Sequence, residues 1–196
     1  MFYLADLIGS FVFAMSGAIA GRQKQMDIFG MFILGLVTAT GGGTLRSLLI
    51  AATPPPVLTD AAYVLIAAAA AILSFFAETL WERFRRVVSF FDALGLGIFV
   101  CIGVQVALAA ELSWWACAGL GMVTASFGGV IRDLLRVEIP LLFRTEIYAT
   151  AALLGGLLYL GAWHAGLPDA WNILLTTTAT AGIRLLSIRY HLDLPR

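Results

Sequence analysis

Two arginines lie inside long apolar stretches of the sequence, each three residues after a run of glycines. Arg46 follows Gly41, Gly42 and Gly43, and Arg132 follows Gly128 and Gly129. A charged side chain at the centre of a membrane helix costs about 2.5 kcal/mol or more, so each arginine must be paired or hydrated. It can brace neighbouring helices, constrict an ion path or bind a substrate carboxylate. The brace is slightly favoured, because a bare positive charge in a narrow pore opposes cations.

The glycine clusters predict breaks in the helices that carry them. Each glycine costs about 1 kcal/mol in a helix relative to alanine, so consecutive glycines favour local unwinding. Unwound backbone is tolerated in a membrane only where it is buried in protein or lines a watery path. The alternative, that the glycines only let helices approach closely, ranks second for these clusters. Four hydroxyls precede the breaks and are predicted to line the path with them: Thr38, Thr40, Thr124 and Ser126.

Three aspartates are candidate partners for the arginines. Asp6 is expected near the depth of Arg46, and Asp92 near the depth of Arg132, at opposite mouths of one pathway. Asp133 is a further supporting acid, and it has no acidic counterpart, since Ser47 holds the equivalent position. Arg184, near the end of the last apolar stretch, is expected to reach the membrane interface.

The sequence contains an internal duplication. A shift of 86 positions places residues 38–46 on residues 124–132 without a gap, and it pairs Asp6 with Asp92 and Phe13 with Phe99. Each unit holds three apolar spans, and an odd number of spans inverts the second copy in the bilayer. Glycine-interrupted spans at matching positions of inverted repeats point to a permeation or binding site near the membrane midplane.

Composition requires a membrane protein. The chain has 196 residues, of which 61% are hydrophobic and only 12% charged. A bilayer core about 30 Å thick needs about 20 apolar residues per helix. The sequence therefore predicts an all-α fold of seven transmembrane helices in a single membrane domain, 1–196. Its parts are one repeat over about 3–80, a second over about 88–163 and a closing helix over about 170–188. The spans predicted to break are the second, about 27–50, and the fifth, about 114–136.

Basic residues indicate the orientation of the chain. Lys and Arg occur after the first, third and fifth spans and after the seventh, and they are absent from the intervening loops. By the positive-inside rule the N-terminus is outside and the C-terminus cytoplasmic. The two cysteines and two histidines lack metal-ligand spacing, so no metal or cofactor is predicted. No enzymatic or nucleic-acid-binding motif occurs, and transport is the expected class.

The duplicated unit, the two glycine clusters with their trailing Arg46 and Arg132, and the seventh span together resemble the prokaryotic trimeric intracellular cation (TRIC) channels. The resemblance covers essentially the whole chain. It implies a homotrimer in a bacterial or archaeal plasma membrane, with a pore for monovalent cations, chiefly potassium, in each subunit. It also implies helices kinked at the glycine motifs. Phe127 departs from the pattern, because the first repeat has Gly41 there, and this indicates a stiffer second break.

Two other functions remain open. Related bacterial proteins with this repeat are described as glycine transporters, and a carrier of a small zwitterion would use helix N-terminal amides and Arg132 for the carboxylate. A non-conducting membrane scaffold ranks last, because it leaves the repeated glycines unexplained.

Overall fold

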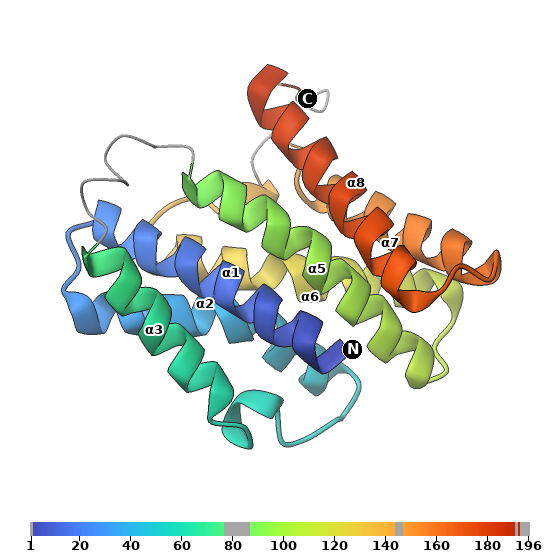
Figure 1. The fold of residues 1–196 in the computed structure, drawn as a ribbon, viewed down its shortest axis with the longest axis horizontal. Coiled ribbons are helices and arrows are strands. Elements are labelled where there is room, and N and C mark those ends of the chain that lie inside the picture. Colours follow the sequence, from blue (N-terminus) through green and yellow to red (C-terminus); the bar gives the residue numbers. More distant parts are fainter. Residues whose placement is uncertain (1, 77–86, 144–146, 191, 193–196) are drawn as a thin grey trace.

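The computed structural model describes residues 2–76, 87–143, 147–190 and 192, and the regular secondary structure of this part of the chain is all helical (Figure 1). It holds seven long helices: α1 (Phe2–Gln23), α2 (Ile28–Leu49), α3 (Ala62–Phe76), α5 (Val87–Ala109), α6 (Trp114–Leu135), α7 (Ala149–His164) and α8 (Asp169–Tyr190). Two single 3₁₀ turns, η1 (Pro56–Leu58) and η2 (Leu141–Phe143), follow α2 and α6. The seven helices match the predicted spans. The end of the third span, 77–80, and the basic residues Arg83, Arg85, Arg86, Arg144 and Arg196 lie outside the described residues.

Helices α1 and α5 form the centre of the bundle and run in opposite directions (Figure 1). They are the equivalent first helices of the two repeats, so their antiparallel course agrees with the predicted inversion. The rings of Phe13 and Phe99, which are repeat mates, meet with centroids 5.0 Å apart. Gly9 faces Phe99, and its mate Gly95 faces Phe13. The pseudo-twofold axis therefore passes between these two aromatic rings.

The outer surface suits a lipid environment. Among the described residues, four helices are long and apolar enough to cross a membrane by length and composition, namely α1, α2, α5 and α6, and α3 is a shorter apolar helix. Large apolar side chains such as Leu65, Ile72 and Leu154 are exposed on it. A water-soluble protein rarely exposes so much contiguous apolar surface, whereas lipid tails cover it without cost.

Charged side chains gather at one end of the bundle, where α1 ends and α6 ends. Lys24 pairs with Glu138 at 3.0 Å, and Arg136 pairs with Glu138 at 3.2 Å. Arg136 also donates a hydrogen bond to the side chain of Gln23 at 3.4 Å. The basic residues after the first and fifth spans therefore share one side, as the charge pattern predicts.

At the opposite end of the bundle, Asp60 lies in the turn just before α3 and accepts a bond from the start of that helix. Its carboxylate accepts hydrogen bonds from the Tyr3 hydroxyl at 2.6 Å and from the backbone N–H of Ala62 at 2.9 Å. These bonds, the first above all, hold the pKa of Asp60 below its usual value.

A lowered pKa contributes stability that is present above the unfolded-state pKa, about 3.9, and is lost as the pH falls through the folded pKa. We expect Tyr3→Phe to raise the pKa of Asp60 toward its usual value, because the strongest donor is removed. An NMR titration of the Asp60 carboxyl measures this. An unchanged pKa in Tyr3→Phe would show that the hydroxyl is not the cause.

Candidate functional site

The two helices predicted to break at glycine clusters are continuous. α2 is helical from Ile28 to Leu49 and α6 from Trp114 to Leu135, including every glycine of both clusters. The prediction of unwound segments is therefore wrong for this structure. Lipid cannot satisfy freed carbonyls and amides, so a helix keeps its backbone bonds unless other groups replace them. The energy that offsets the poor helix propensity of glycine comes from close helix contact.

That contact is the crossing of α2 and α6, which is reciprocal about the pseudo-twofold axis. A Cβ atom added to Gly42 would lie 1.9 Å from the carbonyl oxygen of Thr124, and one added to Gly128 would lie 2.1 Å from that of Thr38. Thr38 and Thr124 are repeat mates, as are Gly42 and Gly128. A side chain at either glycine would force the backbones apart. The second-ranked interpretation of the clusters, close approach, is the one that the structure supports.

The four predicted hydroxyls bond to their own helices. Thr38 donates to the carbonyl of Leu34 at 2.6 Å, and its mate Thr124 donates to Leu120 at 2.6 Å. The other mates do the same, with bonds of 2.7 Å from Thr40 to Leu36 and of 2.7 Å from Ser126 to Met122. In this conformation these hydroxyls serve the helix backbone, a common role of Ser and Thr in membrane helices.

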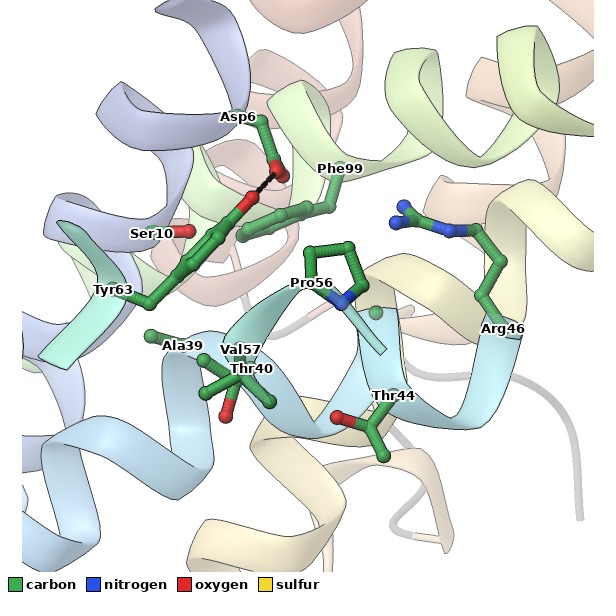
Figure 2. A pocket seen from close by; sticks show the side chains of 11 residues that line it. Asp6, Ser10, Ala39, Thr40, Thr44, Arg46, Pro56, Val57, Tyr63 and Phe99 are labelled. Carbon is green, nitrogen blue, oxygen red and sulfur yellow. Dashed lines mark hydrogen bonds between the residues drawn. The ribbon is translucent and has the colours of Figure 1, made fainter. Parts of the chain in front are cut away.

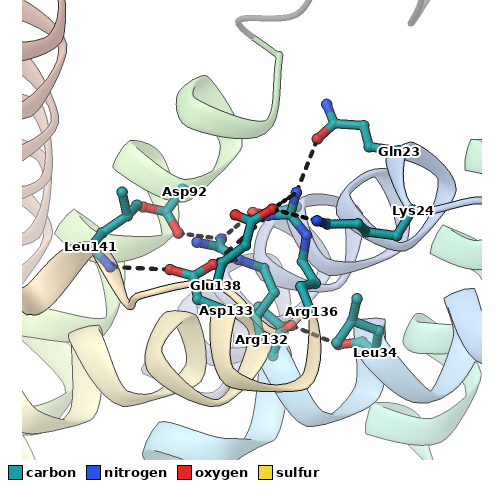
Figure 3. Close-up of polar contacts among 11 residues, drawn as sticks. Gln23, Lys24, Leu34, Asp92, Arg132, Asp133, Arg136, Glu138 and Leu141 are labelled. Carbon is teal, nitrogen blue, oxygen red and sulfur yellow. Dashed lines mark hydrogen bonds and ion pairs between the residues drawn. The ribbon is translucent and has the colours of Figure 1, made fainter.

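Arg132 lies in a buried cluster at the charged end of the bundle (Figure 3). Arg132 is 1% exposed, and its guanidinium pairs with Asp92 at 2.6 Å and with Asp133 at 2.9 Å. It also donates to the Ser16 hydroxyl at 2.7 Å. The second oxygen of Asp133 accepts the backbone N–H of Leu141 at 3.2 Å, so the turn after α6 is tied to the cluster. The contact predicted between Asp92 and Arg132 is present, and the charge of Arg132 is fully compensated.

Arg46 has a different environment, although it is the repeat mate of Arg132. Within the described part of the chain, Asp6 and Arg46 form no ion pair, and Nη1 of Arg46 has no hydrogen-bond partner. Arg46 is only 6% exposed. The predicted Asp6–Arg46 contact is therefore absent. Asp6 instead accepts a hydrogen bond from the hydroxyl of Tyr63 on α3.

A small cavity separates the two charges. It has a volume of about 20 Å³, room for about one water molecule, and Asp6, Tyr63 and Arg46 line it together with Thr40 and Gly43. Figure 2 shows the guanidinium of Arg46 pointing toward the Asp6–Tyr63 pair from the opposite side of this space. Ser10 also lines the cavity, and its buried hydroxyl has no hydrogen-bond partner among the described residues.

Sequence reasoning missed the tyrosines and misplaced one arginine. Tyr63 is the second residue of the third helix in the first repeat, and Tyr148 directly precedes the third helix of the second. The shift of 86 residues pairs Tyr63 with Ala149, so the match is offset by one position and escapes an ungapped comparison. Arg184 is buried at 2% exposure, not at the interface, and its guanidinium lies over the Tyr148 ring, 5.1 Å from the centroid. The signal for Tyr148 was a tyrosine at the start of the third span in each repeat.

The described residues hold no group of three or more His, Cys, Asp or Glu side chains that could bind a metal ion. Cys101 and Cys117 are buried and unbridged, on α5 and α6. The chemistry of the site is thus that of arginines, carboxylates and hydroxyls at two symmetry-related positions in a membrane bundle.

These features define an integral membrane protein of the channel and carrier class, built from an inverted repeat. A family model described as "Glycine transporter" matches residues 3–79 and again 89–164, once in each repeat. The inner membrane protein YadS of Escherichia coli is 36% identical over 98% of this chain and 94% of its own length. A membrane protein of Vibrio cholerae is 37% identical over 100% of this chain and 82% of its own length.

Solved structures of related channels are similar to this chain over nearly its whole length. The TRIC trimeric intracellular cation channel orthologue from Rhodobacter sphaeroides is 34% identical, with a TM-score of 0.91 over 97% of this chain and 98% of that one. A prokaryotic TRIC channel crystallised in 0.5 M KCl is 31% identical, with a TM-score of 0.90 over 98% of each chain. The chain belongs to the prokaryotic TRIC channel family, whose repeated unit the glycine transporter model also describes.

Proposed function

We propose that this protein is a potassium-permeable channel for monovalent cations, with a pore in each subunit of a homotrimer. The observation that carries the proposal is the likeness to the Rhodobacter sphaeroides trimeric cation channel, at 34% identity and a TM-score of 0.91. The charged end of the bundle, with Lys24 and Arg136, is proposed to face the cytoplasm, with the N-terminus outside, because basic residues are retained on that side.

The proposed path runs along α2 and α6 and is narrowest at their crossing. Arg46 lies on one side of this crossing and Arg132 on the other, since each follows its glycine cluster on helices of opposite direction. The contact between Gly42 and the Thr124 carbonyl leaves no space for an ion. Conduction therefore requires α2 and α6 to move apart there. The hydroxyls and carbonyls near 38–43 and 124–129 then replace part of the water around the cation.

Charge compensation decides whether a cation passes each arginine. Two carboxylates, Asp92 and Asp133, compensate Arg132, so it presents no net positive charge to a cation. Arg46 has one nearby acid, Asp6, and no direct contact with it in the described residues. The repulsive barrier to cations is therefore expected at Arg46.

A planar-bilayer recording of the purified protein under a potassium chloride gradient tests the proposal. We expect discrete current steps that reverse near the potassium equilibrium potential, because hydroxyls and carbonyls along the path coordinate cations and two carboxylates compensate Arg132. Native mass spectrometry in detergent is expected to give three copies of the chain. A silent bilayer from folded protein, or reversal at the chloride potential, would refute the cation channel.

A carrier of a small amino acid such as glycine is the second candidate, favoured by the family model that matches both repeats. Arg132 is unsuited to the substrate carboxylate in this conformation, because Asp92, Asp133 and Ser16 already occupy its guanidinium. Arg46 is the better carboxylate partner, since its Nη1 faces the cavity without a partner in the described chain. Saturable uptake of labelled glycine, lost in Arg46→Gln, would support the carrier.

A further inference from the structure

The two repeats contain the same three kinds of side chain in two different bonding arrangements. The first triad is Asp6, Tyr63 and Arg46, and the second triad is Asp92, Tyr148 and Arg132. In each, the aspartate comes from the first helix of the repeat, the arginine from the second, and the tyrosine from the start of the third. The aspartates and arginines are repeat mates in the sequence.

In the first triad the aspartate is bonded to the tyrosine. The Tyr63 hydroxyl donates to Asp6, and the arginine is left with an unpartnered, buried Nη1 in the part of the chain that the structure describes. The cavity of about 20 Å³ separates the two halves of this triad. The Asp6 carboxylate thus accepts a bond from the neutral Tyr63 hydroxyl, while the cationic Arg46 keeps a donor without a partner.

In the second triad the aspartate is bonded to the arginine. Arg132 and Asp92 are 2.6 Å apart, and here the buried hydroxyl of Tyr148 has no hydrogen-bond partner among the described residues. The three groups surround one point beside Gly129. A Cβ atom there would lie 2.7 Å from the Tyr148 hydroxyl, 3.5 Å from Asp92 Oδ1 and 3.6 Å from Arg132 Nη2. Tyr148 is therefore placed to compete for Asp92.

We propose that the aspartate of each triad exchanges between its tyrosine and its arginine, and that the two repeats show the two positions of one switch. A buried polar group without a hydrogen-bond partner costs free energy. Each triad is therefore destabilised by the tyrosine or arginine that its aspartate leaves unbonded. In each arrangement one member of the triad lacks a bond, so the two arrangements are of similar free energy, as a two-state switch requires. Asp133 holds the Arg132 guanidinium in place beside Asp92, whereas Ser47 at the matching position gives Arg46 no such anchor.

The switch deepens the proposed channel function and rests on it for its effect on current. When Asp6 is bonded to Tyr63, the charge of Arg46 faces the path without direct compensation and opposes cations. When Asp6 moves to Arg46, the charge is paired and the barrier falls. Tyr63 is thus a positioning residue for the carboxylate, and it holds the first triad in its non-conducting arrangement.

The test uses Tyr63→Phe, which removes only the hydroxyl, in the full-length protein. We expect the structure of this variant to show Asp6 in a direct ion pair with Arg46. In bilayer recordings the ratio of conducting to non-conducting time is expected to rise about tenfold, the change expected for loss of one hydrogen bond to a carboxylate. Unitary conductance and reversal potential stay at their wild-type values, because the path itself is unaltered.

Tyr148→Phe is the matched control. Its hydroxyl has no partner in the described chain, and Asp92 is already bonded to Arg132, so we expect its loss to leave that pair in place and to change the conducting ratio much less than Tyr63→Phe does. A rise in this control equal to that of Tyr63→Phe would overturn the switch. So would a folded Tyr63→Phe protein in which Asp6 stays apart from Arg46.

If Tyr63→Phe does not fold, a second variant, Arg46→Gln, tests the same proposal. Arg46→Gln removes the uncompensated charge while Tyr63 stays in place, so the conducting ratio rises again. A wild-type ratio in Arg46→Gln contradicts the inference. If the wild-type protein carries no current at all, the channel function fails, while the position of Asp6 in the Tyr63→Phe structure still decides whether the switch exists.

Discussion

Replacing Gly42 by alanine is expected to separate α2 from α6 and to destabilise the protein by about 3 kcal/mol, the upper end of the usual cost of overpacking. The new Cβ would lie 1.9 Å from the carbonyl oxygen of Thr124, which is backbone and cannot rotate away. For a chain of this length the loss corresponds to an unfolding midpoint lower by about 6 to 12 °C. Thermal unfolding in detergent, followed by circular dichroism, measures it. Gly128→Ala, which meets the Thr38 carbonyl at 2.1 Å, is expected to behave alike.

Gly43→Ala is the control within the same cluster. Its Cβ would meet only the Arg46 side chain, with the nearest atom, Nη2, at 3.6 Å, an ordinary contact distance. Because alanine is about 1 kcal/mol better than glycine in a helix, we expect an unchanged or higher midpoint. This pair of neighbouring substitutions separates close approach from helix breaking. Equal midpoints for Gly42→Ala and Gly43→Ala would refute the proposed role of the crossing.

Replacing Asp92 by asparagine is expected to destabilise the protein by about 3 kcal/mol, because it removes a carboxylate from a fully buried guanidinium. Asp133 remains 2.9 Å from Arg132 and limits the loss. Its repeat mate provides the comparison: Asp6→Asn is expected to cost about 1 kcal/mol, since Asp6 bonds to a neutral hydroxyl and asparagine still accepts that bond. Chemical unfolding of both variants in the same detergent measures the difference.

A double-mutant cycle with Arg132→Gln isolates the pair itself. If the ion pair causes the loss, the double variant Asp92→Asn with Arg132→Gln is less destabilised than the sum of its single substitutions. Strict additivity, or an equal cost for Asp6→Asn and Asp92→Asn, would mean that the two triads are bonded alike. That result would contradict the different environments that the structure gives to Arg46 and Arg132.

Much of the architecture could be predicted because it depends on local composition and on duplication. Long apolar runs require helices in a bilayer, since only internal hydrogen bonds satisfy the backbone there. The odd number of spans per repeat requires inversion, and the opposite courses of α1 and α5 agree with it (Figure 1). The same symmetry predicted a carboxylate for each arginine, because few buried groups can compensate an arginine, and this holds for Arg132 with Asp92 but not for Arg46 with Asp6.

The fate of the glycine clusters could not be predicted from local preference. Propensity scales measure the cost of glycine in an isolated helix, and that cost favoured a break. They contain no information about a second helix at the Gly42 and Gly128 positions. In the bundle, absence of a side chain lets the α2 and α6 backbones touch, so tertiary contact kept both helices intact.

The sequence by itself determined the seven helices, their inverted duplication and the placing of Arg46 and Arg132 inside apolar spans, because hydrophobic length and internal repetition are properties of the chain alone. Only the tertiary structure decided which partner each aspartate takes. Asp6 and Asp92 occupy equivalent positions, yet one bonds to Tyr63 and the other to Arg132. The physical reason is that hydrogen-bond choice depends on distances of a few ångströms among side chains from three helices, and a symmetric sequence pattern allows both arrangements.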